Sequence, residues 1–327
     1  MYENVNIGIV SYCNAKCYLC NRQTVPEFPR VTMSIETFRK VIPYAKKMSF
    51  IGGFGDFINH PQSLDFVREI GDKPFMIETN AGIRDESYWK ELASMANDAD
   101  HYVQFSVDEV FESQNPYRMV DTKIVLHNLK TFIDAGGYAV VKTIRFNFNE
   151  DKIPIMTEFF KSIGVKEYHT QLSIYYPDKG DSILSAPHVP GVFVNGTLPL
   201  VYKINEKFSK SGVKCGWKEG RWLYIVENGE VHRCCKLSIY INGMQDNAPA
   251  PISKYTQDEY YDDISEIYYR NKELINLNTD GVTMETIQNN EYFRYIEEKF
   301  KHVKRCKISC ALRYDIANRM LGLKRIF

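Results

Sequence analysis

The chain alternates short apolar runs with longer segments in which apolar residues recur every three or four positions. Such alternation predicts β-strands that are each followed by an amphipathic helix. Six apolar runs predict strands, at residues 5–10, 48–51, 75–82, 101–107, 138–146 and 167–174. The segments between them predict helices, at residues 35–45, 63–70, 85–97, 121–135 and 151–163. Strand–helix units of this length are typical of an α/β fold with a parallel sheet.

The six units are too few to close an eight-stranded barrel. A different pattern follows residue 200. Residues 220–233 form two apolar runs around Asn228-Gly229, which predicts a tight β-hairpin, and residues 309–323 predict a helix. We therefore expect two domains, residues 1–200 and residues 201–327.

Composition narrows the class of protein only a little. Among 327 residues, 41 Lys and Arg balance 41 Asp and Glu, so we expect no nucleic-acid-binding surface. No apolar stretch approaches the length of a membrane span. Because a strand is predicted within the first residues, we expect no signal peptide and no leader-peptide-binding domain ahead of it, and a cytoplasmic location. In a reducing cytosol, eight cysteines indicate metal binding rather than disulfides.

Three cysteines, Cys13, Cys17 and Cys20, follow the first predicted strand at CxxxCxxC spacing. Three thiolates on one loop can hold three irons of a four-iron cluster, which normally takes four cysteines. No further cysteine occurs before Cys215, so one iron would be left open for a non-protein ligand, as in a catalytic site. The alternatives are half of a zinc site or a disulfide framework. Zinc sites favour paired CxxC knuckles, and an odd cysteine triplet is a poor disulfide scaffold.

This spacing, with the aromatic Tyr18 after Cys17, resembles the signature of radical S-adenosylmethionine (radical SAM) enzymes. That family more often has the aromatic residue directly before the third cysteine, where this chain has Leu19. The resemblance implies an open, TIM-like (β/α)6 partial barrel and a [4Fe-4S] cluster whose open iron binds S-adenosylmethionine. It implies that the enzyme reductively cleaves S-adenosylmethionine to a 5′-deoxyadenosyl radical, which abstracts hydrogen from an unactivated C–H bond. It also implies a one-electron reductant such as flavodoxin or ferredoxin.

Loops after the later strands resemble the family's S-adenosylmethionine-binding segments. The run Gly53-Phe54-Gly55-Asp56-Phe57 stands where the family has Gly-Gly-Glu-Pro, with Asp and Phe in place of Glu and Pro. Thr79-Asn80-Ala81-Gly82 resembles its Thr-Asn-Gly turn. The resemblance thus implies cofactor-binding roles for Gly53, Gly55, Asp56, Asn80, Ser106, Asp108 and Arg145. Each of these residues, taken alone, is equally well explained as a turn residue, a helix cap or a solvated loop residue.

A second cysteine group comprises Cys215, Cys234, Cys235, Cys306 and Cys310. The predicted hairpin brings Cys215 and Cys234 together, and Cys306 and Cys310 are four residues apart at the start of the predicted helix. This arrangement resembles the SPASM and twitch auxiliary domains of the superfamily. It implies a second [4Fe-4S] cluster on Cys215, Cys234, Cys306 and Cys310, with structural zinc as the alternative. Because neighbours on a strand face opposite ways, Cys235 is left over, either as a small buried side chain or as a catalytic thiol that donates a hydrogen atom to a substrate radical.

The resemblance leaves the substrate open. A peptide ranks first, because such auxiliary domains are most often found in ribosomal peptide maturases. Dehydrogenation of a sugar or aminocyclitol alcohol ranks second, because the single-cluster form resembles that subgroup. The alternative from another class is a non-catalytic, zinc-binding interaction protein. Residues 240–300 are acidic and rich in tyrosine and do not indicate a substrate.

Overall fold

The structure is a computed structural model, and it describes residues 1–17, 20, 22, 30–172, 215–235, 237 and 259–300. The chain divides into two compact units. Unit 1 comprises Met1–Tyr12, Asn21–Pro74 and Asn205–Arg313. Unit 2 comprises Cys13–Cys20, Phe75–Ile204 and Tyr314–Phe327. The predicted domain boundary at residue 200 lies outside the described residues.

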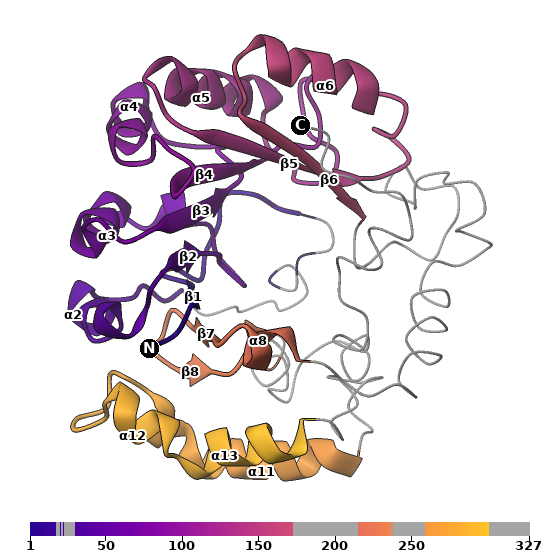
Figure 1. Cartoon of the computed structure of the whole chain (residues 1–327). Helices are drawn as coiled ribbons and strands as arrows, with labels where there is room; N and C mark the ends of the chain where they lie inside the picture. Colours follow the sequence, from indigo (N-terminus) through magenta and orange to yellow (C-terminus); the bar gives the residue numbers. More distant parts are fainter. Residues whose placement is uncertain are drawn as a thin grey trace. The chain divides into compact units, whose positions relative to one another are not determined.

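Unit 2 holds four parallel strands in chain order, β3 (Phe75–Thr79), β4 (His101–Ser106), β5 (Ala139–Arg145) and β6 (Glu167–Leu172). The helices α4 (Glu86–Met95), α5 (Thr122–Asp134) and α6 (Ile153–Ser162) connect them and lie along one face of these strands (Figure 1). Aromatic side chains fill the space between strands and helices. The Phe105 ring lies 5.7 Å from Trp89 and 5.3 Å from Phe132 between centroids, which fixes β4 against α4 and α5.

Unit 1 holds the strands β1 (Asn4–Ile7), β2 (Met48–Phe50), β7 (Trp222–Ile225) and β8 (Val231–His232), in the order β2-β1-β7-β8. Its first helices are α2 (Ile35–Arg39) and α3 (Ser63–Ile70). The Phe38 ring of α2 lies 5.9 Å from Phe50 of β2 and 4.9 Å from Phe66 of α3 between centroids. One aromatic cluster therefore joins α2, α3 and β2.

The strand β7 pairs in parallel with β1, with Val5 opposite Leu223 and Ile7 opposite Ile225. The pattern of residues 220–233 predicts only a hairpin, so this pairing is a finding of the structure. The hairpin itself is confirmed, because β8 pairs antiparallel with β7. Its turn has Gly229 at φ 87°, a left-handed conformation that glycine adopts without strain.

The remaining described helices of unit 1 lie on either side of the hairpin in the chain. They are α8 (Gly216–Glu219), before β7, and then α11 (Glu259–Asn271), α12 (Met284–Gln288) and α13 (Glu291–Lys299). Short 3₁₀ helices occur at Ile42–Tyr44, Phe57–Asn59 and Lys272–Ile275. Figure 1 shows α11, α12 and α13 together beside β8. The helix predicted at 309–323 lies outside the described residues.

Three predicted elements end at least three residues earlier than expected. The helix predicted over 35–45 ends at Arg39 and is followed by the 3₁₀ helix Ile42–Tyr44. Pro43 has no backbone N–H to continue an α-helix, which accounts for the change. The strand predicted over 5–10 ends at Ile7. The strand predicted over 75–82 ends at Thr79, where the turn of Asn80 and Ala81 begins.

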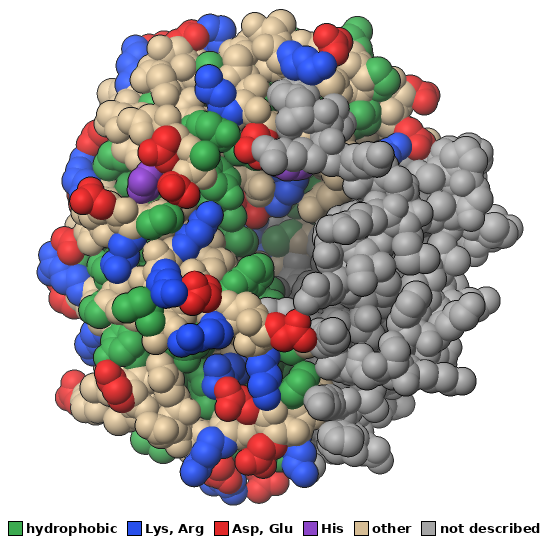
Figure 2. Space-filling view, viewed as in Figure 1, with side chains coloured by type: hydrophobic (Ala, Val, Ile, Leu, Met, Phe, Trp, Pro, Cys, Tyr) green, Lys and Arg blue, Asp and Glu red, His purple; other side chains and the backbone are tan. Residues whose placement is uncertain are grey.

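Lys and Arg side chains are interspersed with Asp and Glu on the face drawn in Figure 2, in keeping with the zero net charge. No helix among the described residues is both long enough and apolar enough to cross a membrane.

Candidate functional site

Residues 13–20, which we call the cysteine loop, belong to unit 2 and contact the turn after β3. The Sγ atom of Cys13 accepts a hydrogen bond from the backbone N–H of Ala15 at 3.3 Å and another from the Asn80 side-chain amide at 3.3 Å. The amides of Asn80 and Asn14 also bond each other in both directions at 3.1 Å. Asn80 is buried. It therefore holds the Asn14 side chain and the first thiol of the cysteine loop at once.

The turn of Thr79-Asn80-Ala81-Gly82 allows this close approach. Ala81 has φ 55°, and a side chain at Gly82 would place its Cβ 2.6 Å from the Asn14 amide nitrogen. Only glycine fits against Asn14 at that distance. The structure thus brings together two predicted sites, the cysteine loop and the Asn80 turn.

The donor set of the cysteine loop fits an iron–sulfur cluster. Cys13, Cys17 and Cys20 are all partly exposed, and none forms a disulfide within the described part of the chain. The two N–H···S bonds to Cys13 are the kind that stabilise a ligating thiolate. Among the described residues, no three His, Cys, Asp or Glu side chains already converge as a metal site. The fit therefore rests on the thiols and their hydrogen bonds. Tyr18 and Leu19 lie outside the described residues.

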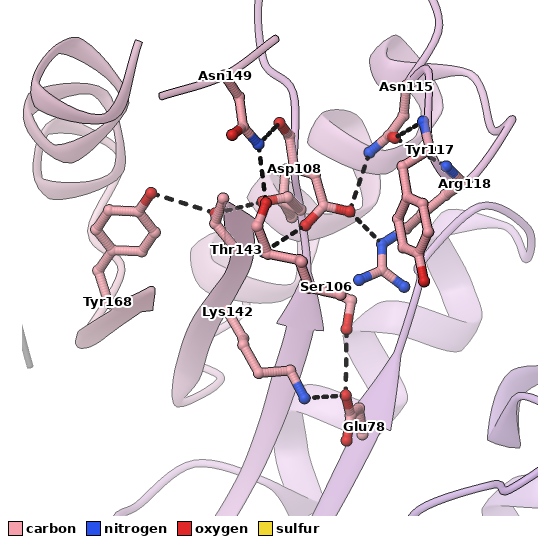
Figure 3. Close-up of polar contacts among 12 residues, drawn as sticks. Glu78, Ser106, Asp108, Asn115, Tyr117, Arg118, Lys142, Thr143, Asn149 and Tyr168 are labelled. Carbon is pink, nitrogen blue, oxygen red and sulfur yellow. Dashed lines mark hydrogen bonds and ion pairs between the residues drawn. The ribbon is translucent and has the colours of Figure 1, made fainter. Parts of the chain in front are cut away.

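Asp108 follows β4 and is completely buried (Figure 3). Its carboxylate accepts the backbone N–H of Ile144 at 2.7 Å and the Nε–H of Arg118 at 2.7 Å. Asn115 donates to the same carboxylate at 3.5 Å. Both carboxylate oxygens thus have protein partners, which indicates that Asp108 positions Arg118. Nothing in the sequence pattern singles out Arg118.

Ser106 lies at the end of β4 and donates to Glu78 of β3 at 3.4 Å. Glu78 also forms an ion pair with Lys142 of β5, so three neighbouring strands contribute to one polar cluster (Figure 3). Burial would raise the pKa of Glu78, but the charge and hydrogen bond of Lys142 lower it overall. Sequence reasoning missed Glu78 and Lys142. Their signal was present, since both are charged residues inside otherwise apolar strands.

Arg145, at the end of β5, forms an ion pair with Glu150 at 3.2 Å. Because this contact ties Arg145 to the segment just before α6, the structure supplies a structural role for it. Its predicted contact with S-adenosylmethionine stays a prediction.

The glycine loop, residues 52–55, lies in unit 1 beside the end of the segment that follows β1. A Cβ at Gly55 would lie 1.9 Å from the carbonyl oxygen of Val10, and the N–H of Asp56 donates to the carbonyl of Tyr12 at 3.3 Å. The buried Tyr224 hydroxyl accepts the N–H of Gly53 at 3.1 Å. The glycine loop is therefore packed against the residues that lead into Cys13.

Asp56 has a local structural task. Its side chain accepts the N–H of Ile58 at 3.3 Å and caps the 3₁₀ helix Phe57–Asn59. The residue is buried. This placement accounts for an aspartate where the family has glutamate, because a short side chain can cap the helix directly after it.

Gly55→Ala is expected to destabilise unit 1, because the added methyl group cannot occupy a position 1.9 Å from a backbone oxygen. Overpacking of this kind costs roughly 1–3 kcal/mol. Urea denaturation of the variant and the parent protein measures the difference. A variant as stable as the parent would show that the glycine loop does not press on Val10.

The second cysteine group lies in unit 1. Cys234 is buried, whereas Cys215 and Cys235 are partly exposed. The strand β8 ends at His232, so the alternation of strand side chains does not decide between Cys234 and Cys235 as a ligand. Cys306 and Cys310 lie outside the described residues. The four-cysteine site stays a prediction.

No protein-family model matches the chain. Among curated proteins, a stretch of 116 residues is 33% identical to the tungsten-containing aldehyde ferredoxin oxidoreductase cofactor-modifying protein of Pyrococcus furiosus. The match covers 33% of this chain and 32% of the relative, so the chain spans about a third of that relative's length.

Solved structures match far more of the chain. anSMEcpe with bound AdoMet superposes with a TM-score of 0.55 at 14% identity, over 98% of this chain and 95% of that one. SuiB from Streptococcus suis, bound to the precursor peptide SuiA, superposes with a TM-score of 0.53 at 12% identity, over 81% of this chain and 67% of that one. Both neighbours are radical SAM enzymes.

The chain therefore shares its fold with these two proteins. Its mostly parallel, unclosed α/β sheet confirms the predicted partial barrel.

Proposed function

We propose that the chain is a radical SAM enzyme that abstracts hydrogen from an unactivated C–H bond of its substrate. The observation that carries this proposal is the CxxxCxxC cysteine loop held by Asn80, on a fold shared with enzymes that bind AdoMet.

A cluster bound by Cys13, Cys17 and Cys20 would supply the electron that cleaves S-adenosylmethionine to methionine and a 5′-deoxyadenosyl radical. The protein's own task is to hold and orient. Asn80 fixes the cysteine loop through Asn14 and Cys13. The glycine loop, kept close to Tyr12 by the Asp56 N–H, offers backbone groups to the ligand. A flavodoxin or ferredoxin is the proposed reductant.

Residues 201–327 are proposed as a twitch-like domain with a second [4Fe-4S] cluster. Cys215, Cys234, Cys306 and Cys310 are its proposed ligands, and the hairpin that separates the first two is present in the structure. The second cluster would accept the electron left on the substrate radical or bind the substrate. Cys235 stays the candidate hydrogen-atom donor.

A peptide is the proposed substrate. SuiB was solved with a precursor peptide and anSMEcpe with the Cp18Cys peptide, at TM-scores of 0.53 and 0.52. The partial match to a cofactor-modifying protein favours, as a second candidate, a substrate that serves another enzyme as its cofactor.

The proposal is tested by anaerobic reconstitution of the full chain with iron and sulfide. Two clusters predict about eight irons per chain and dithionite-dependent release of 5′-deoxyadenosine from S-adenosylmethionine. Cys13→Ala is expected to lose about half of the iron and all of the 5′-deoxyadenosine. Cys234→Ala is expected to lose the other half of the iron, with Cys235→Ala as its matched control that keeps the full iron content.

Two bound zinc ions and no cleavage of S-adenosylmethionine would overturn the proposal in favour of a zinc-binding protein. Deuterium transfer from labelled candidate peptides into 5′-deoxyadenosine would then identify the carbon that is attacked. Absence of transfer from every peptide tested, with transfer from a small molecule, would reject the peptide as substrate.

A further inference from the structure

The loop between β4 and α5 holds Arg118 in one place. The Asn115 side chain accepts the backbone N–H groups of Tyr117 and Arg118, both at 2.9 Å. The backbone N–H of Asn115 donates to the carbonyl of Val120 at 3.0 Å. The loop is therefore closed on itself, and Arg118 has little freedom to move.

The guanidinium group of Arg118 is fixed as firmly as its backbone (Figure 3). Its Nε donates to Asp108, and its Cζ lies 5.4 Å from the centre of the Tyr117 ring. Only 12% of the Arg118 side chain is exposed, and Asp108 is fully buried. The terminal nitrogens Nη1 and Nη2 donate no hydrogen bond to any residue that the structure describes. A fixed cation with two unused donor groups is suited to an anion that the protein itself does not supply.

Arg118 lies next to the cysteine loop. Its carbonyl oxygen accepts the backbone N–H of Lys16 at 3.0 Å. Burial alone would lower the pKa of Arg118, but the negative charges of Asp108 and of a Cys17 thiolate raise it above its ordinary value. Burial raises the pKa of the neighbouring Tyr117 phenol, and the charges of Cys17 and Cys20 raise it further, although the charge of Arg118 lowers it.

We propose that Arg118 raises the reduction potential of the cluster held by the cysteine loop. The inference rests on the proposed function, which supplies the cluster. One-electron reduction adds a negative charge to the cluster, and a fixed cation nearby stabilises that charge. Asp108 is a positioning residue in this arrangement, because it orients the guanidinium group and compensates its burial.

The test is an EPR-monitored redox titration of the reconstituted full chain without S-adenosylmethionine. The signal of the cysteine-loop cluster is identified by its loss in Cys13→Ala. Arg118→Gln is expected to lower the ratio of reduced to oxidised cluster at a fixed potential about tenfold, which is 59 mV for a one-electron couple. Arg118→Lys keeps the charge and is expected to restore most of the ratio.

Lys130→Gln is the matched control, because it removes one positive charge from an exposed site on α5 of the same unit. It is expected to leave the ratio unchanged. If Arg118→Gln fails to fold because Asp108 loses its partner, the double variant Arg118→Gln with Asp108→Asn removes both charges. It is expected to shift the ratio in the same direction by a smaller factor.

An unchanged ratio in Arg118→Gln, together with weaker binding of S-adenosylmethionine by calorimetry, would overturn the inference. Arg118 would then bind the carboxylate of S-adenosylmethionine without affecting the reduction potential of the cluster. A parent protein that takes up no iron would overturn the proposed function, and the inference with it. The two failures are thus separated by the iron content of the parent protein.

Discussion

Glu227→Gln is expected to be more stable than the parent protein, and increasingly so as the pH rises. Its gain in free energy of unfolding should be about 2–3 kcal/mol larger at pH 8 than at pH 5. Glu227 follows β7 and is only 3% exposed, and its Oε1 atom has no hydrogen-bond partner among the described residues. Gly8 leaves the space that this side chain fills, since a Cβ there would lie 3.0 Å from Oε1. Burial raises the pKa of Glu227 from 4.5 to about 7.

The direction in which stability changes with pH follows from the raised pKa of Glu227 in the folded state. Well below pH 4.5 the carboxyl group is neutral in the folded and the unfolded state, so folding does not bury a charge. Between pH 4.5 and 7 the unfolded chain ionises first, so stability falls as the pH rises. Glutamine cannot ionise and removes this dependence. Urea denaturation of both proteins from pH 5 to 8 measures it, and parallel curves for the two would show that Glu227 is paired in solution.

Glu230→Gln is expected to have the opposite effect and to destabilise the protein by about 3–5 kcal/mol near neutral pH. Glu230 is 1% exposed and lies three residues beyond Glu227. Its carboxylate accepts hydrogen bonds from Tyr268 at 2.9 Å and Asn228 at 2.9 Å, and it contacts the Nε2 of buried His232 at 3.2 Å. Glutamine keeps one acceptor oxygen but replaces the other with an NH2 group, which cannot accept from the buried donors on that side.

The two glutamates also differ in the direction of their pH dependence. Burial would raise the pKa of Glu230, but the hydrogen bond and charge of His232, with Tyr268 and Asn228, lower it overall. Its stabilisation is therefore present above the unfolded pKa and is lost as the pH falls through the folded pKa.

Urea denaturation should accordingly show a larger deficit for Glu230→Gln at pH 7 than in acid. Tyr268→Phe, which removes one of the bonds to Glu230, should lose only about 1.5–3 kcal/mol. Equal deficits for Glu230→Gln at both pH values would show that the carboxylate is not ionised in the folded protein.

The strand and helix order of the barrel could be predicted from periodicity, because each strand–helix unit is local. The pairing of β7 with β1 could not, since the hairpin pattern of 220–233 fixes its local partner and carries no mark of a distant one. Pro43 shows the same limit on a smaller scale. The apolar spacing continued past Arg39, but a missing N–H ended the helix.

The candidate site likewise contains residues that the sequence predicted and residues that it did not. Cys13 and Asn80 belong to short motifs, and the structure joins them by a hydrogen bond. Arg118 belongs to no motif, and its role depends on Asp108 ten residues earlier and on a loop folded back to Lys16. The role of such a residue becomes visible only from its tertiary contacts, because its neighbours in the sequence do not distinguish it.

The parallel pairing of β1 with β7 also sets the order in which the protein can be assembled during synthesis. Residues 4–7 leave the ribosome well before their partner strand at 222–225, which follows more than two hundred residues later. Until then one edge of β1 has unpaired backbone groups, and closing so long a loop is slow. The segment leading from β1 into Cys13 gains its final support only at that point. We therefore expect iron to be acquired only after the hairpin has been translated.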